Sequence, residues 1–209
     1  MSNEPADTAP APVVVVDARY CAPAATAFAV TKTISVTGRD FTVTDARGAV
    51  VMQVEAAVFS FLHHRSVLLD GPSRRPVLTM QDSTYLASTR WEAYRGDSTG
   101  RRNLLFVAVK TSPVQLARTK VRVFLARNGS GERVPDYVIG GSYYAGACTV
   151  SAGGGGGESE SDDAIARITR QNTAGGAFLG RHTYTARINP GVDQAFILAL
   201  TVILDQMHH

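Results

Sequence analysis

The most continuous run of apolar residues lies between Asn189 and Met207. Apolar side chains dominate from Ala195 to Leu204 and leave no polar stripe at any helical phase, so a helix here must be buried on all sides. Asn189 and Pro190 favour a helix start, and Asp193 then lies in the first turn, where a carboxylate suits the helix dipole. The pattern predicts a core helix.

A membrane span is the alternative interpretation of this segment. From Pro190 to Met207 a helix rises roughly 27 Å, but the apolar part between Asp193 and Asp205 covers only about half of that length. A span needs about 20 apolar residues. We therefore expect a helix enclosed by protein and no transmembrane span.

Short apolar runs rich in β-branched residues, separated by turn residues, precede this segment and predict β-hairpins. Asp45 to Gly48 and Asn128-Gly129 are typical hairpin turns. Residues 164–170 fit either a strand or a short helix capped by Asp. The predicted strands are 13–16, 28–34, 41–44, 50–54, 67–69, 77–80, 91–94, 104–109, 121–125, 137–139, 143–151, 164–170 and 183–188.

These elements predict one domain over residues 13–207. Residues 1–12 carry almost no large apolar side chain and are expected to form a disordered tail. Residues 152–163 combine glycines with acidic residues and are expected to form a flexible loop. Many short strands followed by one apolar helix predict a mainly β fold, a closed antiparallel barrel of about twelve strands enclosing the helix, because closure removes edge strands.

Four motifs resemble the plant LURP-one-related proteins, and the similarity runs from about Val13 to Met207. They are Phe41-x-Val43-x-Asp45-x-x-Gly48, Trp91-Glu92-x-Tyr94-Arg95-Gly96-Asp97, Gly141-Ser142 and the run from Asn189 to Leu200. The resemblance implies a twelve-strand barrel around a central hydrophobic helix, as in tubby C-terminal domains and phospholipid scramblases. It also implies an association with plant defence and, through tubby domains, phosphoinositide binding. Tyr85 to Ser88 stand where a more basic stretch is expected.

Basic residues supply the candidate binding site. Arg118, Lys120 and Arg122 recur at period two with apolar residues between them, so a strand would place three cations on its outer face. Arg101-Arg102 and Arg74-Arg75 lie in predicted turns and extend this stripe. Clustered phosphates of a lipid headgroup suit such a surface. An ordinary solvated strand face is the alternative, since the net charge is only +3.

Motifs for catalysis and metal binding are missing from the sequence. No Gly-x-Ser-x-Gly motif is present, and the glycines at 153–157 lack the Lys-Ser/Thr pair of a phosphate-binding loop. Adjacent His63 and His64 would point to opposite faces of a strand, and Cys21 and Cys148 fit no metal spacing. We expect no catalytic residues, no metal and no cofactor.

The first hypothesis is therefore a non-enzymatic, defence-associated protein that binds an anionic lipid headgroup of phosphoinositide type or a protein partner. The alternatives are a scramblase-like lipid transporter and a transcription-linked module. The latter would need a nuclear localisation signal, and no run of five basic residues occurs. Nucleic acid is disfavoured as a partner. Without a signal peptide, we expect an intracellular protein, cytoplasmic and either peripheral at the membrane or nuclear.

Overall fold

The structure, a computed structural model, describes residues 11–37, 39–57, 64–83, 89–110, 118–154, 164–171 and 182–208. Most of the expected tail at 1–12 and of the expected loop at 152–163 lies outside these ranges. His63 and the stretch from Tyr85 to Ser88 also lie outside them.

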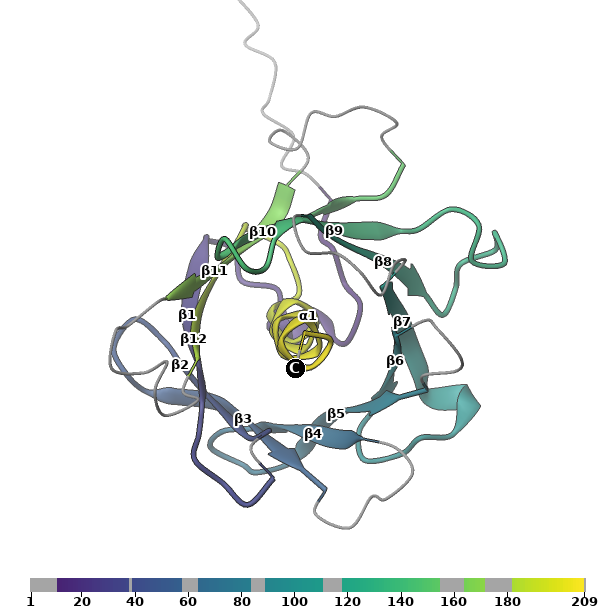
Figure 1. Ribbon diagram of the computed structural model, residues 1–209. Coiled ribbons are helices and arrows are strands. Elements are labelled where there is room, and N and C mark those ends of the chain that lie inside the picture. Colours follow the sequence, from purple (N-terminus) through teal and green to yellow (C-terminus); the bar gives the residue numbers. More distant parts are fainter. Residues whose placement is uncertain are drawn as a thin grey trace, which may run out of the picture.

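Twelve strands form one closed antiparallel barrel (Figure 1). Each strand pairs with its neighbours in sequence, and β1 closes the ring on β12, with Thr26 opposite Ile188. This confirms the predicted fold class. The strands are β1 (Thr26–Lys32), β2 (Phe41–Thr44), β3 (Val50–Ala56), β4 (Arg65–Asp70), β5 (Pro76–Asp82), β6 (Thr89–Arg95), β7 (Leu104–Lys110), β8 (Thr119–Leu125), β9 (Tyr137–Ser142), β10 (Ala147–Ala152), β11 (Ala164–Gln171) and β12 (Thr183–Ile188).

The helix α1 (Gln194–Gln206) lies inside the ring of strands, as Figure 1 shows. All of its residues from Ala195 to Asp205 are buried. Phe196, in the first turn of α1, is fully buried, with its ring centroid 5.1 Å from that of Phe106 and 5.4 Å from that of Tyr137. The predicted enclosure is confirmed, and apolar side chains from the strands fill the space around the helix.

The helix begins at Gln194, later than the predicted start at Asn189 and Pro190. Gly191 takes a left-handed conformation with φ of 74°, which a helix cannot include. Asp193 is the N-cap, and its carboxylate accepts a hydrogen bond of 3.2 Å from the backbone N–H of Phe196.

The predicted strand at 13–16 is wrong. Only an isolated bridge between Val13 and Val192 forms there, and a short 3-10 helix, η1 (Ala18–Tyr20), follows. The backbone N–H groups of Val15, Val16 and Asp17 donate to the Asp193 carboxylate, at 3.1, 2.6 and 3.1 Å. These donors bind one carboxylate, so they cannot pair with a neighbouring strand.

Two further segments differ in detail from the prediction. Residues 164–170 belong to strand β11 and not to a helix. The hairpin of β8 and β9 is present, but residues 126–136 connect the strands, and the positive φ angles in this loop fall at Gly131 and Glu132 rather than at Asn128-Gly129. A long loop replaces the expected tight turn.

The helix gives the barrel two distinguishable ends. At the N-cap end, where α1 begins, lie the segment from Val13 to Cys21 and the loop between β8 and β9. At the C-cap end, where α1 finishes, lie the start of β8 at Thr119 and the end of β1 at Lys32.

Candidate anion-binding surface and buried polar cluster

Acidic residues within the strands are confined to one side of the barrel. Glu55, Asp70, Asp82 and Glu92 lie on the four consecutive strands β3 to β6. The other eight strands, contiguous in the ring, contain no Asp or Glu. Cations on these eight strands therefore have no acidic residue on their own strand or, away from β3 and β6, on a neighbouring one.

Strand β8 carries the predicted basic stripe on its outer face. Lys120 is exposed and Arg122 is half-buried, whereas Val121 and Val123 between and after them are fully buried. Arg118, directly before the strand, is exposed. The alternation that the sequence predicts is present, and the three cations share the outer wall.

Arg122 already has several partners. Its Nη2 donates to the carbonyl oxygens of Arg133 at 2.7 Å and Glu132 at 3.2 Å, and its Cζ lies 5.0 Å from the centroid of the Phe124 ring. Glu132 is itself bound by both terminal nitrogens of Arg90 at 2.8 Å, and these hydrogen bonds are the main reason that the pKa of the Glu132 carboxyl is lowered. The Arg122 guanidinium is therefore less available to a ligand than that of Arg118.

The structure does not bring Arg101 and Arg102 to this stripe. They lie in the 3-10 helix η2 (Arg101–Asn103) before β7, at the N-cap end. Arg122 is opposite Val109 of β7, and Val109 is five residues from Leu104, or roughly 17 Å along the strand. The same surface does not include Arg74 either, because its guanidinium pairs with Glu55 on β3, one of the four strands that carry acidic residues.

Two functional candidates were missed by the sequence interpretation, Arg167 on β11 and Arg187 on β12. Both are exposed, and the strand register places them directly opposite each other. The same cross-strand row continues through Thr149 and Gly140 to Lys120. Apolar Ala166 and Ile168 on either side of Arg167 could have indicated in the sequence that Arg167 points outward. Only the strand register shows that Arg187 lies opposite it. We call the outward cations Arg118, Lys120, Arg122, Arg167 and Arg187 the basic wall.

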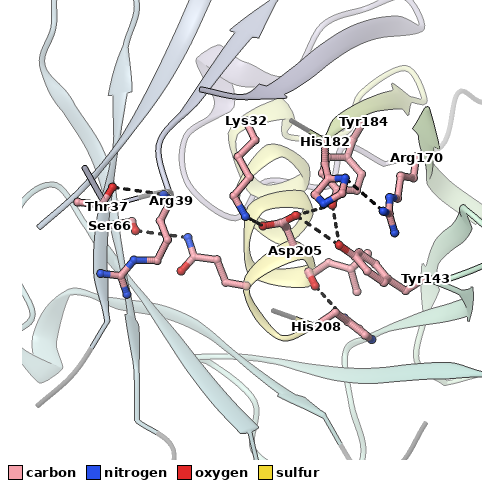
Figure 2. Close-up of polar contacts among 12 residues, drawn as sticks. Lys32, Thr37, Arg39, Ser66, Tyr143, Arg170, His182, Tyr184, Asp205 and His208 are labelled. Atoms are coloured by element: carbon pink, nitrogen blue, oxygen red, sulfur yellow. Dashed lines mark hydrogen bonds and ion pairs between the residues drawn. The ribbon is translucent and has the colours of Figure 1, made fainter. Parts of the chain in front are cut away.

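A second group of polar residues surrounds the C-terminal end of α1 (Figure 2). Asp205 is fully buried in the last turn, where a negative charge opposes the helix dipole. Its Oδ2 accepts from Lys32 Nζ at 2.9 Å, and its Oδ1 accepts from the hydroxyls of Tyr184 at 2.5 Å and Tyr143 at 3.3 Å. Figure 2 shows these three side chains converging on the carboxylate.

Burial controls the protonation of this polar cluster. Desolvation, with the nearby Asp205 charge as the next cause, raises the pKa of both Tyr143 and Tyr184. The tyrosines therefore remain protonated donors at neutral pH. The ring of His208 stacks on Tyr143 with centroids 4.2 Å apart, and Arg170 contacts His182 at 3.2 Å between Nη2 and Nδ1. The arrangement stabilises a buried carboxylate and ties the helix end to strands β1 and β12.

Within the described part of the chain, no group of three or more His, Cys, Asp or Glu residues could hold a metal ion. Both cysteines are free, and burial raises the pKa of the Cys148 thiol to about 11. No helix in the described ranges is long and apolar enough to cross a bilayer, and α1 itself has 13 residues.

Comparison with known proteins agrees with this architecture. Residues 26–205 match the LURP-one-related family. The chain is 39% identical to Protein LURP-one-related 15 of Arabidopsis thaliana, over 93% of this chain and 86% of that protein. It is 34% identical to Protein LURP1 of the same plant, over 92% of this chain and 89% of that protein.

A solved structure shows the same fold. An X-ray structure of an Arabidopsis thaliana protein superimposes with a TM-score of 0.69 at 33% sequence identity, covering 94% of this chain and 99% of the other. The family match covers most of the chain, including all twelve strands and nearly all of the helix. The chain therefore belongs to the LURP-one-related family.

Proposed function

We propose that this protein is a non-enzymatic binding protein whose basic wall binds anionic lipid headgroups of phosphoinositide type. The observation that carries the proposal is the separation of charge around the barrel. Eight contiguous strands contain no acidic residue, and the cations of the basic wall project from them. The plant-defence association that the family resemblance implies is part of the same proposal.

Weak, reversible recruitment is the expected mode of binding. Each cation near an anionic membrane contributes on the order of 1 kcal/mol, so a few cations give a few kcal/mol. The charges act through water over a Debye length of about 10 Å at 0.1 M salt, so binding should fall steeply as salt rises. Recruitment of this kind needs no membrane-spanning segment, and α1 is enclosed by the strands.

Co-sedimentation with liposomes tests the proposal. Phosphatidylcholine vesicles with and without a phosphoinositide are compared, at low and moderate salt, for the parent and for Arg118→Glu/Lys120→Glu. We expect the parent to bind only the phosphoinositide vesicles. The variant should bind roughly 30-fold more weakly, because two cations of about 1 kcal/mol each are lost and 1.4 kcal/mol is tenfold.

A control with the same change in net charge separates the basic wall from general charge effects. Arg47→Glu/Arg75→Glu alters two exposed arginines in the turns after β2 and β4, beside the four strands that carry acidic residues. This control should bind nearly as well as the parent. Equal loss in both variants, or no binding by the parent, would contradict the proposal. Binding of the parent to vesicles lacking the phosphoinositide would also contradict it.

A further inference from the structure

Arg167 and Arg187 are an unusual pair for two adjacent antiparallel strands. They lie directly opposite each other on β11 and β12, and both are exposed. Side chains opposite each other in such a ladder have Cβ atoms about 4.5–5.5 Å apart, and like charges at that spacing destabilise the sheet. The fold alone therefore gives no reason to place two arginines here.

The neighbouring pairs of outward-facing residues on β11 and β12 show which side chains occupy the other positions of this ladder. Thr169 lies opposite Thr185, and Gln171 lies opposite Thr183. Gln171 Nε2 donates to Thr185 Oγ1 at 2.9 Å, so neutral hydrogen-bonding side chains serve these positions. The two arginines are an exception within this pair of strands.

No carboxylate relieves the repulsion among the residues that the structure describes. Neither Arg167 nor Arg187 forms an ion pair or a hydrogen bond through its side chain there. The side chains beside the pair in the same row are Thr149 and Ala27, which are small and uncharged. Within the described part of the chain, the residues next to the two arginines in this row are therefore uncharged.

We propose that Arg167 and Arg187 form a clamp for one phosphate group on the outer wall of the barrel. Guanidinium groups bind phosphate oxygens in bidentate fashion, and two that share one phosphate replace their mutual repulsion by attraction to it. The Thr149 hydroxyl lies beside Arg167 in the same row and is a third donor.

This clamp rests on the proposed function, because it names the residues through which the basic wall takes a phosphate-bearing headgroup. Lys120 lies three strands from Arg167 in the same row, or roughly 14 Å away at about 4.8 Å per strand. It therefore cannot contact the same phosphate. A membrane brings a second anionic group to Lys120, and a soluble phosphate compound does not.

A soluble headgroup tests the clamp without a membrane. Inositol 1,4,5-trisphosphate is titrated calorimetrically into the parent, Arg167→Gln, Arg187→Gln and the double variant, at constant ionic strength, and the Tm of each protein is measured with and without it. The clamp needs both arginines, so we expect each single variant to lose at least tenfold in affinity and the double variant to lose little more. Independent surface charges would instead give losses that multiply.

The Tm gives a second readout: the substitutions that weaken binding should leave the stability of the free protein unchanged or raise it. Without ligand, each single variant should melt at the same temperature as the parent or higher, because the substitution removes a repulsion. The trisphosphate should raise the Tm of the parent and leave the Tm of the variants unchanged. Arg47→Gln/Arg75→Gln, with the same change in charge, should bind like the parent. Variants that bind like the parent, or single losses that multiply in the double variant, would overturn the clamp.

Liposomes distinguish failure of the clamp from failure of the proposed function. Binding of the trisphosphate that depends on both arginines, without binding to phosphoinositide vesicles, supports the clamp and rejects lipid recruitment. Vesicle binding that is equal in the parent and in Arg167→Gln/Arg187→Gln rejects the clamp and leaves the rest of the basic wall as the lipid site.

Discussion

Three charged side chains are almost completely buried among the residues that the structure describes, and their partners differ. The Asp193 carboxylate accepts hydrogen bonds from four backbone N–H groups, and Asp205 is bound by a lysine and two tyrosines. Lys110, with 7% of its surface exposed, donates to the carbonyl oxygen of Met207 at 3.3 Å, and none of the ion pairs found among the described residues includes it. Desolvation lowers its pKa.

The Lys110→Met substitution should stabilise the protein at neutral pH. The cation carries a desolvation penalty that one carbonyl at the helix C-terminus does not offset, and Met fills similar space without charge. We expect the Tm at pH 7 to rise by a few degrees, since about 1 kcal/mol corresponds to roughly 2–4 °C for a protein of this size. Differential scanning calorimetry measures the change.

The pH dependence identifies the cause of this effect. The pKa of Lys110 is lower in the folded state than in the unfolded state, so the unfolded chain binds more protons between the two values, and stability rises with pH there. The difference in free energy of unfolding between Lys110→Met and the parent should therefore be largest below the pKa of Lys110 in the folded state. It should disappear as the pH passes the pKa of about 10.4 in the unfolded state. The exposed Lys120→Met is the control and should show no such convergence. A constant gap would disprove the desolvation argument.

At the scale of elements, Asp193 connects the start of α1 to the segment from Val13 to Cys21. One carboxylate both caps the helix and binds three consecutive backbone N–H groups from the other end of the chain. The bridge between Cys21 and Asp193 adds backbone pairing at the same place. The N-terminal segment is thus held by the start of the helix, and Arg95 of strand β6 adds a hydrogen bond to the carbonyl oxygen of Val16.

Asp193→Ala should destabilise the protein by at least about 3 kcal/mol, since a lost N-cap costs about 1 kcal/mol and each hydrogen bond to a buried charge contributes about 1.5–3 kcal/mol. Urea denaturation measures the loss, and limited proteolysis should show earlier cleavage between residues 13 and 21. Asp45→Ala is the matched control, because Asp45 also accepts from two backbone N–H groups, of Arg47 and Ala49, but in an exposed turn where water can replace it. Equal effects of both substitutions would contradict the role of Asp193.

Sequence patterns predicted individual elements well and their alignment poorly. Period-two alternation places Lys120 outward and Val121 inward, and an apolar helix without a polar stripe requires an enclosing wall. Which residues stand opposite each other depends on register, and four strand pairs shift register at irregularities such as those after Val43 and Ala93. Such shifts leave no clear mark in the sequence. The β11–β12 pair has no shift, but residues 172–182 separate the two strands in sequence, and a connection of that length does not fix the register as a tight turn would, so the opposition of Arg167 and Arg187 was not predictable. Three of the four hydrogen bonds to the Asp193 carboxylate likewise join residues that are 176 or more positions apart in the sequence.

At the scale of the whole molecule, the ring and the helix depend on each other. Closure pairs β1 with β12, from opposite ends of the domain, and removes exposed strand edges. The enclosed space is filled by side chains of α1, with Phe196 fully buried. Loss of either part exposes the apolar surface of the other, so we expect a single cooperative unfolding transition.

Phe196→Asp tests this dependence. The substitution buries a carboxylate without a partner at a cost of several kcal/mol, and it removes a ring that packs against Phe106 and Tyr137. We expect the variant to be insoluble or unfolded, as measured by centrifugation and circular dichroism. Val36→Asp is the control, because Val36 is 95% exposed and its substitution should leave a folded, soluble protein. Normal folding of Phe196→Asp would rule out the enclosure.

The order of the elements along the chain has a consequence for biosynthesis. The helix that fills the barrel follows all twelve strands, and the strand that closes the ring immediately precedes it. A ribosome synthesises these two elements after the other eleven strands, so the growing chain first carries eleven strands with neither their closing partner nor the helix that fills the barrel. Their apolar faces and unpaired edges are aggregation-prone until both elements have been made. The barrel can therefore close only after α1 has left the ribosome, and chaperones that bind exposed strands should associate with the nascent chain until α1 emerges.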